Sequence, residues 1–259
     1  TCYLPLLQAT YNTVKGARPD TLVIAGSTAL YDAPWFEGLW AIGGLDYADV
    51  VSFHPYEVYF DVSKLSTVIA NANGAMLAYG ADKVRPIWIT ELGWSTVAQG
   101  TTATSESAQA ANLIKSATLN IVAGVPQTYW YDLVDDSPDR NDHESNFGLF
   151  YDRSSGAAAL RPKPAAFAQA LMVEQLKGRP FTELLTVGDG VLAVRFGTGA
   201  DSVIMAWGAT DGLTASFASP TGTAGEMIEL SGKSFPFTAA DGAVSVAIST
   251  SPVFLHGDL

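Results

Sequence analysis

The chain places acidic, aromatic and histidine side chains at the ends of apolar runs, where they could act together in chemistry. Glu91 follows residues 86–89, whose apolar side chains, without polar alternation, predict a strand buried on both faces. Strands of this kind form parallel sheets, and active sites of α/β proteins usually lie at the carboxyl ends of such strands. Glu91 is therefore predicted to face an active site.

Two further predicted strands, within residues 49–56 and 126–134, end in similar residues. The candidates from all three strand ends are His54, Tyr56, Glu57, Glu91, Trp94, Trp130, Asp132, Asp135 and Asp136. Aromatic rings stack on pyranose faces, and a carboxylate can attack or stabilise an oxocarbenium-like centre. The combination favours a carbohydrate site, with Trp94 and Asp135 among the substrate-binding residues.

Each candidate also has a purely structural interpretation. Glu91 could cap a helix, His54 could be a satisfied core histidine, and Tyr56 and Trp130 could pack in the core. The aspartates that follow residue 131 could form a solvated loop.

Other kinds of site are not expected. The three histidines are dispersed and no His/Asp/Glu cluster has the spacing of metal ligands, so we predict no metal site and no cofactor. A serine hydrolase is equally unexpected, because the chain has no G-x-S-x-G elbow.

The order of the elements predicts the fold class. Helical patterns in residues 3–20, 33–48, 62–81, from about 105, and 163–178 alternate with four short apolar strands, which indicates a parallel α/β unit. From residue 179, short alternating segments separated by Gly- and Asp-containing turns predict an antiparallel β-sandwich. We expect a catalytic domain over residues 1–178 and an accessory domain over residues 179–259.

Composition limits the partners. The 259 residues carry a net charge of −12, with a pI near 4.5, which argues against nucleic acid because such binding depends on Lys and Arg. No apolar stretch approaches the roughly 20 residues of a membrane span, so no membrane partner is expected. The only cysteine, Cys2, forms no internal disulfide, and the compartment stays open.

Three motifs resemble a known group of enzymes. "WITELGWS", "DVVSFHPY" and "TYWYDLVDD" resemble the seventh, sixth and eighth strands of clan A retaining glycoside hydrolases, and the family 39 type is the most similar. The resemblance covers roughly residues 1–178 and implies a (β/α)8 barrel, often followed by a small β-sandwich. It also implies that Glu91 is the nucleophile, that Tyr56 orients it, that His54 lines the subsite and that Trp130 is the sugar platform.

One part of the family pattern is absent. These enzymes carry their acid/base glutamate in an Asn-Glu-Pro motif after the fourth strand, and this chain has no Asn-Glu pair. The sequence is therefore expected to represent the second half of a barrel with its β domain, with Glu57 or Asp132 as substitute acids.

A half barrel exposes two sheet edges, which something must cover. One hypothesis is a homodimer that closes an eight-stranded barrel and brings two copies of Glu91 to opposite sides of one cavity. The alternatives are a catalytically inactive fragment, and a carbohydrate-binding or structural module in which the β domain does the work.

Overall fold

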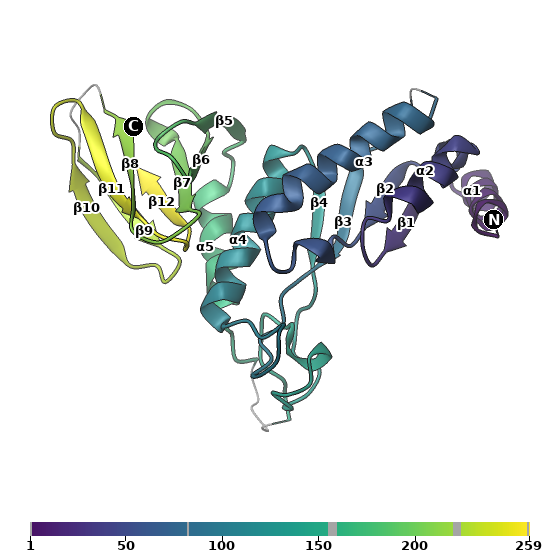
Figure 1. Cartoon of the computed structure of the whole chain (residues 1–259), viewed down its shortest axis with the longest axis horizontal. Helices are drawn as coiled ribbons and strands as arrows, with labels where there is room; N and C mark the ends of the chain where they lie inside the picture. The colour runs from purple at the N-terminus through teal and green to yellow at the C-terminus, as the bar shows by residue number, and fades with distance from the viewer. Residues whose placement is uncertain (1, 82, 155–159, 220–223, 258) are drawn as a thin grey trace. The chain divides into compact units, whose positions relative to one another are not determined.

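The computed structural model describes residues 2–81, 83–154, 160–219, 224–257 and 259. Helices and strands alternate in its first part (Figure 1): α1 (Tyr3–Ala17), β1 (Ile24–Thr28), α2 (Ala33–Ala41), β2 (Val50–Phe53), α3 (Leu65–Tyr79), β3 (Ile87–Leu92), α4 (Glu106–Val122), β4 (Gln127–Trp130) and α5 (Pro164–Leu176). The four strands form one parallel sheet in the order β1-β2-β3-β4. The predicted parallel α/β architecture is confirmed.

Buried apolar side chains hold the helices against this sheet. Phe36 of α2, Phe53 of β2, Leu65 and Ile69 of α3, and Ile89 of β3 are all almost fully buried. Each such side chain contributes about 1.5–3 kcal/mol on leaving water. This packing fixes the strand ends from which the candidate site projects.

Local signals set the ends of the helices. The side chain of Asp32 accepts a hydrogen bond from the Trp35 backbone N–H at 3.2 Å and begins α2. The hydroxyl of Ser105 accepts a hydrogen bond from the Ala108 N–H at 3.1 Å and begins α4. The helix predicted over residues 33–48 ends earlier, at Ala41, because Gly43 adopts a left-handed φ of 89° before a separate 3-10 turn.

The second part of the chain is antiparallel, as predicted. It contains β5 (Phe181–Leu185), β6 (Val191–Phe196), β7 (Val203–Gly208), β8 (Leu213–Ala218), β9 (Ala224–Glu229), β10 (Ser234–Thr238), β11 (Ala243–Ile248) and β12 (Val253–His256). One sheet has the order β10-β9-β12-β7-β6-β5, and β11 pairs with β8 in a second sheet. Ile204, Phe217, Val246 and Leu255 belong to one buried core formed by strands of both sheets.

β10 has Pro236 at its centre, which is a local signal against a strand. Proline lacks the N–H that a ladder needs, so a proline within a run argues against a strand. β10 tolerates it because β10 is an edge strand that pairs only with β9 among the described strands.

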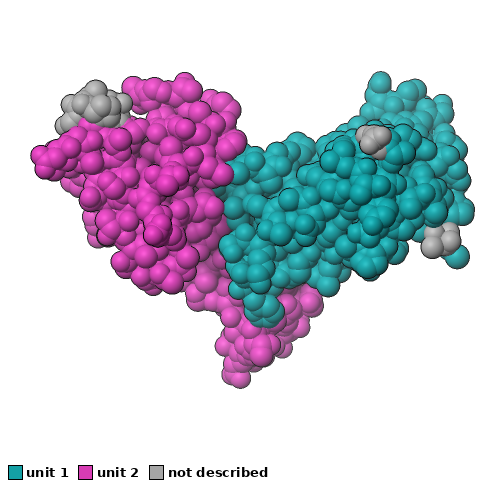
Figure 2. Space-filling model, turned by 45° about the horizontal axis from the view of Figure 1, so that its top comes forward, with its two compact units in different colours: residues 1–94, 116–131 teal, residues 95–115, 132–259 magenta. Residues whose placement is uncertain are grey.

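The chain divides into two compact units (Figure 2): residues 1–94 with 116–131, and residues 95–115 with 132–259. The first contains the parallel sheet, and the second contains α5 and all the antiparallel strands. The predicted boundary between residues 178 and 179 stays a prediction. Among the described residues, no helix combines the length and apolar character needed to cross a bilayer.

Candidate active site

Glu91 lies near the carboxyl end of β3, in the first unit. The pairing of β3 with β4 shifts register between Ile89 and Leu92, and such irregularities re-aim side chains beside active sites. Ile89 and Leu92 are buried, whereas the side chain of Glu91 keeps 31% of its surface exposed. The strand thus presents a half-buried carboxylate that a ligand can reach.

Two side chains from the segment after β2 hold both oxygens of this carboxylate. The Tyr56 hydroxyl donates a hydrogen bond to Glu91 Oε1 at 2.9 Å. His54 Nδ1 lies 3.5 Å from Glu91 Oε2. These two contacts fix the position of the Glu91 carboxylate. The structure therefore brings His54, Tyr56 and Glu91 together.

A row of small polar residues supports this cluster from inside the sheet, and sequence reasoning did not include it. His54 Nε2 lies 3.1 Å from Thr90 Oγ1, and the Thr90 hydroxyl also contacts that of Ser52 on β2. Ser52 is buried within an otherwise apolar strand. The sequence signal that could have predicted this row is a serine and a threonine inside apolar strands, because a buried hydroxyl needs a hydrogen-bond partner.

The two tryptophans of the candidate site have different surroundings. Trp94 is fully buried, and its Nε1 donates to the Tyr59 carbonyl at 2.7 Å. Its ring stacks on that of Trp130, with centroids 5.9 Å apart and planes at 29°. Trp130 is only partly buried. The buried ring of Trp94 therefore packs beneath the partly exposed ring of Trp130. The predicted contact of Trp94 with substrate stays a prediction.

Glu57 lies apart from the Glu91 cluster in its contacts. Its Oε1 accepts a hydrogen bond from the Tyr31 backbone N–H at 3.1 Å. It also lines a pocket whose lining includes neither Glu91 nor His54. Its predicted role as a substitute acid stays a prediction.

Asp132 follows β4 and belongs to the second unit. Burial, followed by the charges of Asp136 and Asp135, raises its pKa to about 6. Its Oδ1 is buried and has no hydrogen-bond partner among the described residues. A carboxyl group in this state can hold and release a proton near neutrality, which is what a general acid requires.

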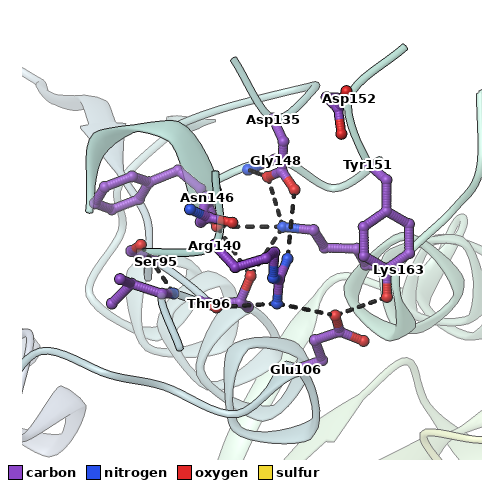
Figure 3. Close-up of polar contacts among 12 residues, drawn as sticks. Ser95, Thr96, Glu106, Asp135, Arg140, Asn146, Gly148, Tyr151, Asp152 and Lys163 are labelled. Atoms are coloured by element: carbon purple, nitrogen blue, oxygen red, sulfur yellow. Dashed lines mark hydrogen bonds and ion pairs between the residues drawn. The ribbon is translucent and has the colours of Figure 1, made fainter. Parts of the chain in front are cut away.

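Asp135 is the centre of a buried polar cluster (Figure 3). Its Oδ1 lies 2.6 Å from Lys163 Nζ, and it accepts a hydrogen bond from the Gly148 N–H at 2.8 Å. The two charged side chains are almost completely buried. Lys163 Nζ also donates to Thr96 Oγ1 at 3.0 Å and to the Asn146 carbonyl at 3.2 Å. This environment is that of a structural ion pair and lends the predicted substrate contact of Asp135 no support.

A second cation extends the cluster. Arg140 donates to the Thr96 carbonyl at 3.0 Å and approaches Glu106 of α4 at 3.5 Å. Glu106 also accepts a hydrogen bond from the Tyr151 hydroxyl at 2.6 Å. Together with Lys163, these contacts tie the segment after β3 to the long segment between β4 and α5. The cluster could not be predicted, because its members are up to 67 residues apart.

Among the residues that the structure describes, no three His, Cys, Asp or Glu side chains are grouped so that they could hold a metal ion. The side chains that contact the Glu91 carboxylate are the phenol of Tyr56 and the imidazole of His54.

No family model and no curated protein matched the sequence. Solved structures do match. A family 39 glycoside hydrolase from the gut symbiont Bacteroides cellulosilyticus WH2 is 25% identical, with a TM-score of 0.77, over 98% of this chain and 54% of its own.

Two further structures share the fold at lower identity. A family 51 arabinofuranosidase from Xanthomonas axonopodis pv. citri is 12% identical, with a TM-score of 0.65, over 97% of this chain and 62% of its own. A family 30 endoxylanase from Clostridium papyrosolvens C71 is 16% identical, with a TM-score of 0.59, over 98% of this chain and 60% of its own.

The chain thus spans between about half and two thirds of the length of these structures. Their similarity to this chain and the observed order of the parallel strands both agree with the fold predicted from the sequence. The chain has four parallel strands with helices followed by antiparallel sheets, and it is structurally similar to clan A glycoside hydrolases of families 39, 30 and 51.

Proposed function

We propose that this chain hydrolyses β-linked glycosides, with Glu91 as the nucleophile of a retaining mechanism. The observation that carries the proposal is the half-buried Glu91 carboxylate, whose two oxygens are engaged by Tyr56 and His54 at the end of a parallel strand. Similarity to glycoside hydrolases of three families supports the same reaction class.

In the proposed reaction, Glu91 attacks the anomeric carbon and displaces the aglycone, which leaves a covalent glycosyl ester. Water then attacks the same carbon and releases the sugar with retained configuration. Tyr56 and His54 orient the carboxylate, and the partly exposed ring of Trp130 stacks on the sugar. These roles require no metal ion or cofactor.

The departing aglycone must receive a proton. Asp132, which belongs to the second unit, stays a predicted substitute acid, and its raised pKa of about 6 would leave part of its population protonated near neutrality. Glu57 is less favoured because its Oε1 is engaged by a hydrogen bond from the Tyr31 N–H. Without general-acid assistance, rates typically fall about 10²- to 10⁴-fold, so substrates with good leaving groups would react best.

We also propose that two copies associate through the edges of the parallel sheet. β1 and β4 are the outer strands of this sheet, and both carry partly exposed apolar side chains, Ile24 and Tyr129. Exposed edges and apolar patches favour association. Light scattering tests this directly: a dimer supports the proposal, and a strict monomer at micromolar concentration contradicts it.

The test of the function is a panel of nitrophenyl glycosides of different sugars, assayed with the parent protein, Glu91→Ala and Glu174→Ala. Glu174 lies exposed on α5, in the second unit, and provides a matched change of charge on another element. The proposal expects turnover of at least one glycoside by the parent and by Glu174→Ala, and none by Glu91→Ala. Equal turnover by Glu91→Ala would exclude Glu91 as the nucleophile. Binding without turnover in all three proteins would favour the alternative of a carbohydrate-binding module.

A further inference from the structure

A pocket of about 600 Å³ in the first unit is distinct from the Glu91 cluster. Its volume falls within the roughly 300–1,000 Å³ of small-molecule sites. The residues that give it chemical character are Tyr31, Glu37, Glu57, Asn71, Gly74 and Tyr79. They come from α2, α3 and the segments after β1 and β2.

The charge of this pocket is negative and uncompensated. Its lining contains two carboxylates, Glu37 and Glu57, and no Lys, Arg or His. Among the described residues neither glutamate forms an ion pair, and the hydrogen bond to Glu57 comes from the neutral Tyr31 N–H. The net charge of −12 adds a field that attracts cations.

Tyr31 supplies a fixed aromatic wall. Its ring stacks on Phe36, with centroids 5.3 Å apart, and packs against Phe53 at 5.1 Å. Its hydroxyl is buried and has no hydrogen-bond partner among the described residues. Burial and the charge of Glu37 raise the pKa of Tyr31 to about 12, so the phenol stays neutral at physiological pH.

Gly74 lines the pocket from within α3. Glycine disfavours the interior of a helix, yet Gly74 lies within α3. A Cβ at this position would meet no atom within 4 Å, so close packing does not explain the glycine. A larger side chain at residue 74 would instead occupy space beside the pocket.

From these observations we propose that the pocket binds a small organic cation, an ammonium group carried on an apolar or aromatic body. Carboxylates bind the ammonium group, and the faces of Tyr31 and Tyr79 interact with a cation through their π electrons. The alanines of α3 that also line the pocket suit the apolar body of such a ligand. The proposal does not rest on the proposed glycoside hydrolysis, and Glu57, the less favoured substitute acid, is the one residue that the two proposals share.

The experiment compares benzylammonium with its neutral analogue benzyl alcohol by calorimetric titration of the full chain at low ionic strength. Three variants alter the pocket: Glu37→Gln and Glu57→Gln remove one charge each, and Gly74→Leu fills the space. Two variants are controls outside it. Glu174→Gln makes the same charge change on α5, and Gly38→Leu places leucine at an exposed helical glycine whose Cβ also meets no atom within 4 Å.

We expect benzylammonium to bind and benzyl alcohol to bind at least about tenfold more weakly. Each of Glu37→Gln and Glu57→Gln should raise the Kd for benzylammonium about five- to tenfold, and Gly74→Leu should abolish binding. Leucine favours helix over glycine, so Gly74→Leu should keep the parent's circular dichroism spectrum. Equal affinity for the two ligands, or equal effects of pocket and control variants, would overturn the proposal.

Discussion

Replacing Lys163 by methionine removes the ammonium group that neutralises Asp135 inside the second unit. The side chain of Lys163 is 0% exposed and that of Asp135 is 2% exposed, with 2.6 Å between Nζ and Oδ1. After the replacement, Asp135 keeps the Gly148 N–H at 2.8 Å and a more distant Arg140 nitrogen at 3.8 Å. These contacts only partly compensate a buried carboxylate.

Removing one partner of a buried ion pair typically costs 3–5 kcal/mol of stability, and the nearby Arg140 places this case at about 3 kcal/mol. A typical domain has only about 5–15 kcal/mol in total, so the loss is large. The surface pair Lys64–Asp61 is the matched comparison, because its side chains are 68% and 44% exposed. Lys64→Met should cost less than about 1 kcal/mol.

The loss should also depend on pH. Burial raises the pKa of Asp135 even in the parent, where Lys163 opposes the rise. Without Lys163 the folded-state pKa rises further above the unfolded value of about 3.9. The full cost then applies above the folded-state pKa, decreases as pH falls through it, and vanishes near the unfolded value.

Urea unfolding followed by circular dichroism at about pH 7.5 and about pH 4.5 measures both effects. The double variant Lys163→Met/Asp135→Asn should recover most of the lost stability, because it leaves no unpaired charge. A loss as small as that of Lys64→Met, or a loss that is the same at both pH values, would refute this reasoning.

Three further changes have defined outcomes. Tyr56→Phe removes the hydrogen bond that positions the Glu91 carboxylate, at a cost of about 1.5–3 kcal/mol, so kcat/KM for nitrophenyl glycosides should fall about 10- to 100-fold and the free energy of unfolding in urea should fall by no more than that amount. Asp132→Asn should be more stable than the parent above about pH 6, since the raised pKa makes ionisation of Asp132 costly there, and this advantage should disappear below about pH 4. Ser105→Ala removes the N-cap of α4 and should cost about 1 kcal/mol of unfolding free energy, measured in urea.

Each of these predictions has a result that contradicts it. Unchanged kcat/KM in Tyr56→Phe would show that its contact with Glu91 has no catalytic value. If the difference in stability between Asp132→Asn and the parent did not depend on pH, the pKa of Asp132 would not be raised. Ser105→Thr, which keeps the hydroxyl, is the control for the N-cap, and a loss equal to that of Ser105→Ala would count against the capping role.

The alternation of apolar strands with helical segments predicted the parallel α/β part, and the clearest strands, β2 and β3, are mostly apolar runs. The same runs identified Glu91, and the nearby His54 and Tyr56 proved to contact it. These residues could be found because each follows a strand, and the ends of neighbouring parallel strands meet at one edge of the sheet.

The remainder depends on contacts that a local pattern does not encode. Trp94 follows the same strand as Glu91 but turns into the core, and its burial depends on Tyr59 and Trp130. In the sequence Asp135 looks like an ordinary loop aspartate. Its buried ion pair with Lys163, 28 residues further along the chain, becomes visible only in the structure. Lys163 itself stands just before a helix, where lysine is ordinarily a solvated residue.

Covalent trapping tests the central role of Glu91 most directly. A 2-deoxy-2-fluoro glycoside with a dinitrophenyl leaving group needs little acid assistance and forms a long-lived ester with the nucleophile of a retaining glycosidase. After incubation and peptide mapping by mass spectrometry, we predict one added fluoroglycosyl group on the peptide that contains Glu91, and none in Glu91→Gln. A label on a different carboxylate, or turnover of the reagent by Glu91→Gln at the parent's rate, would contradict the account.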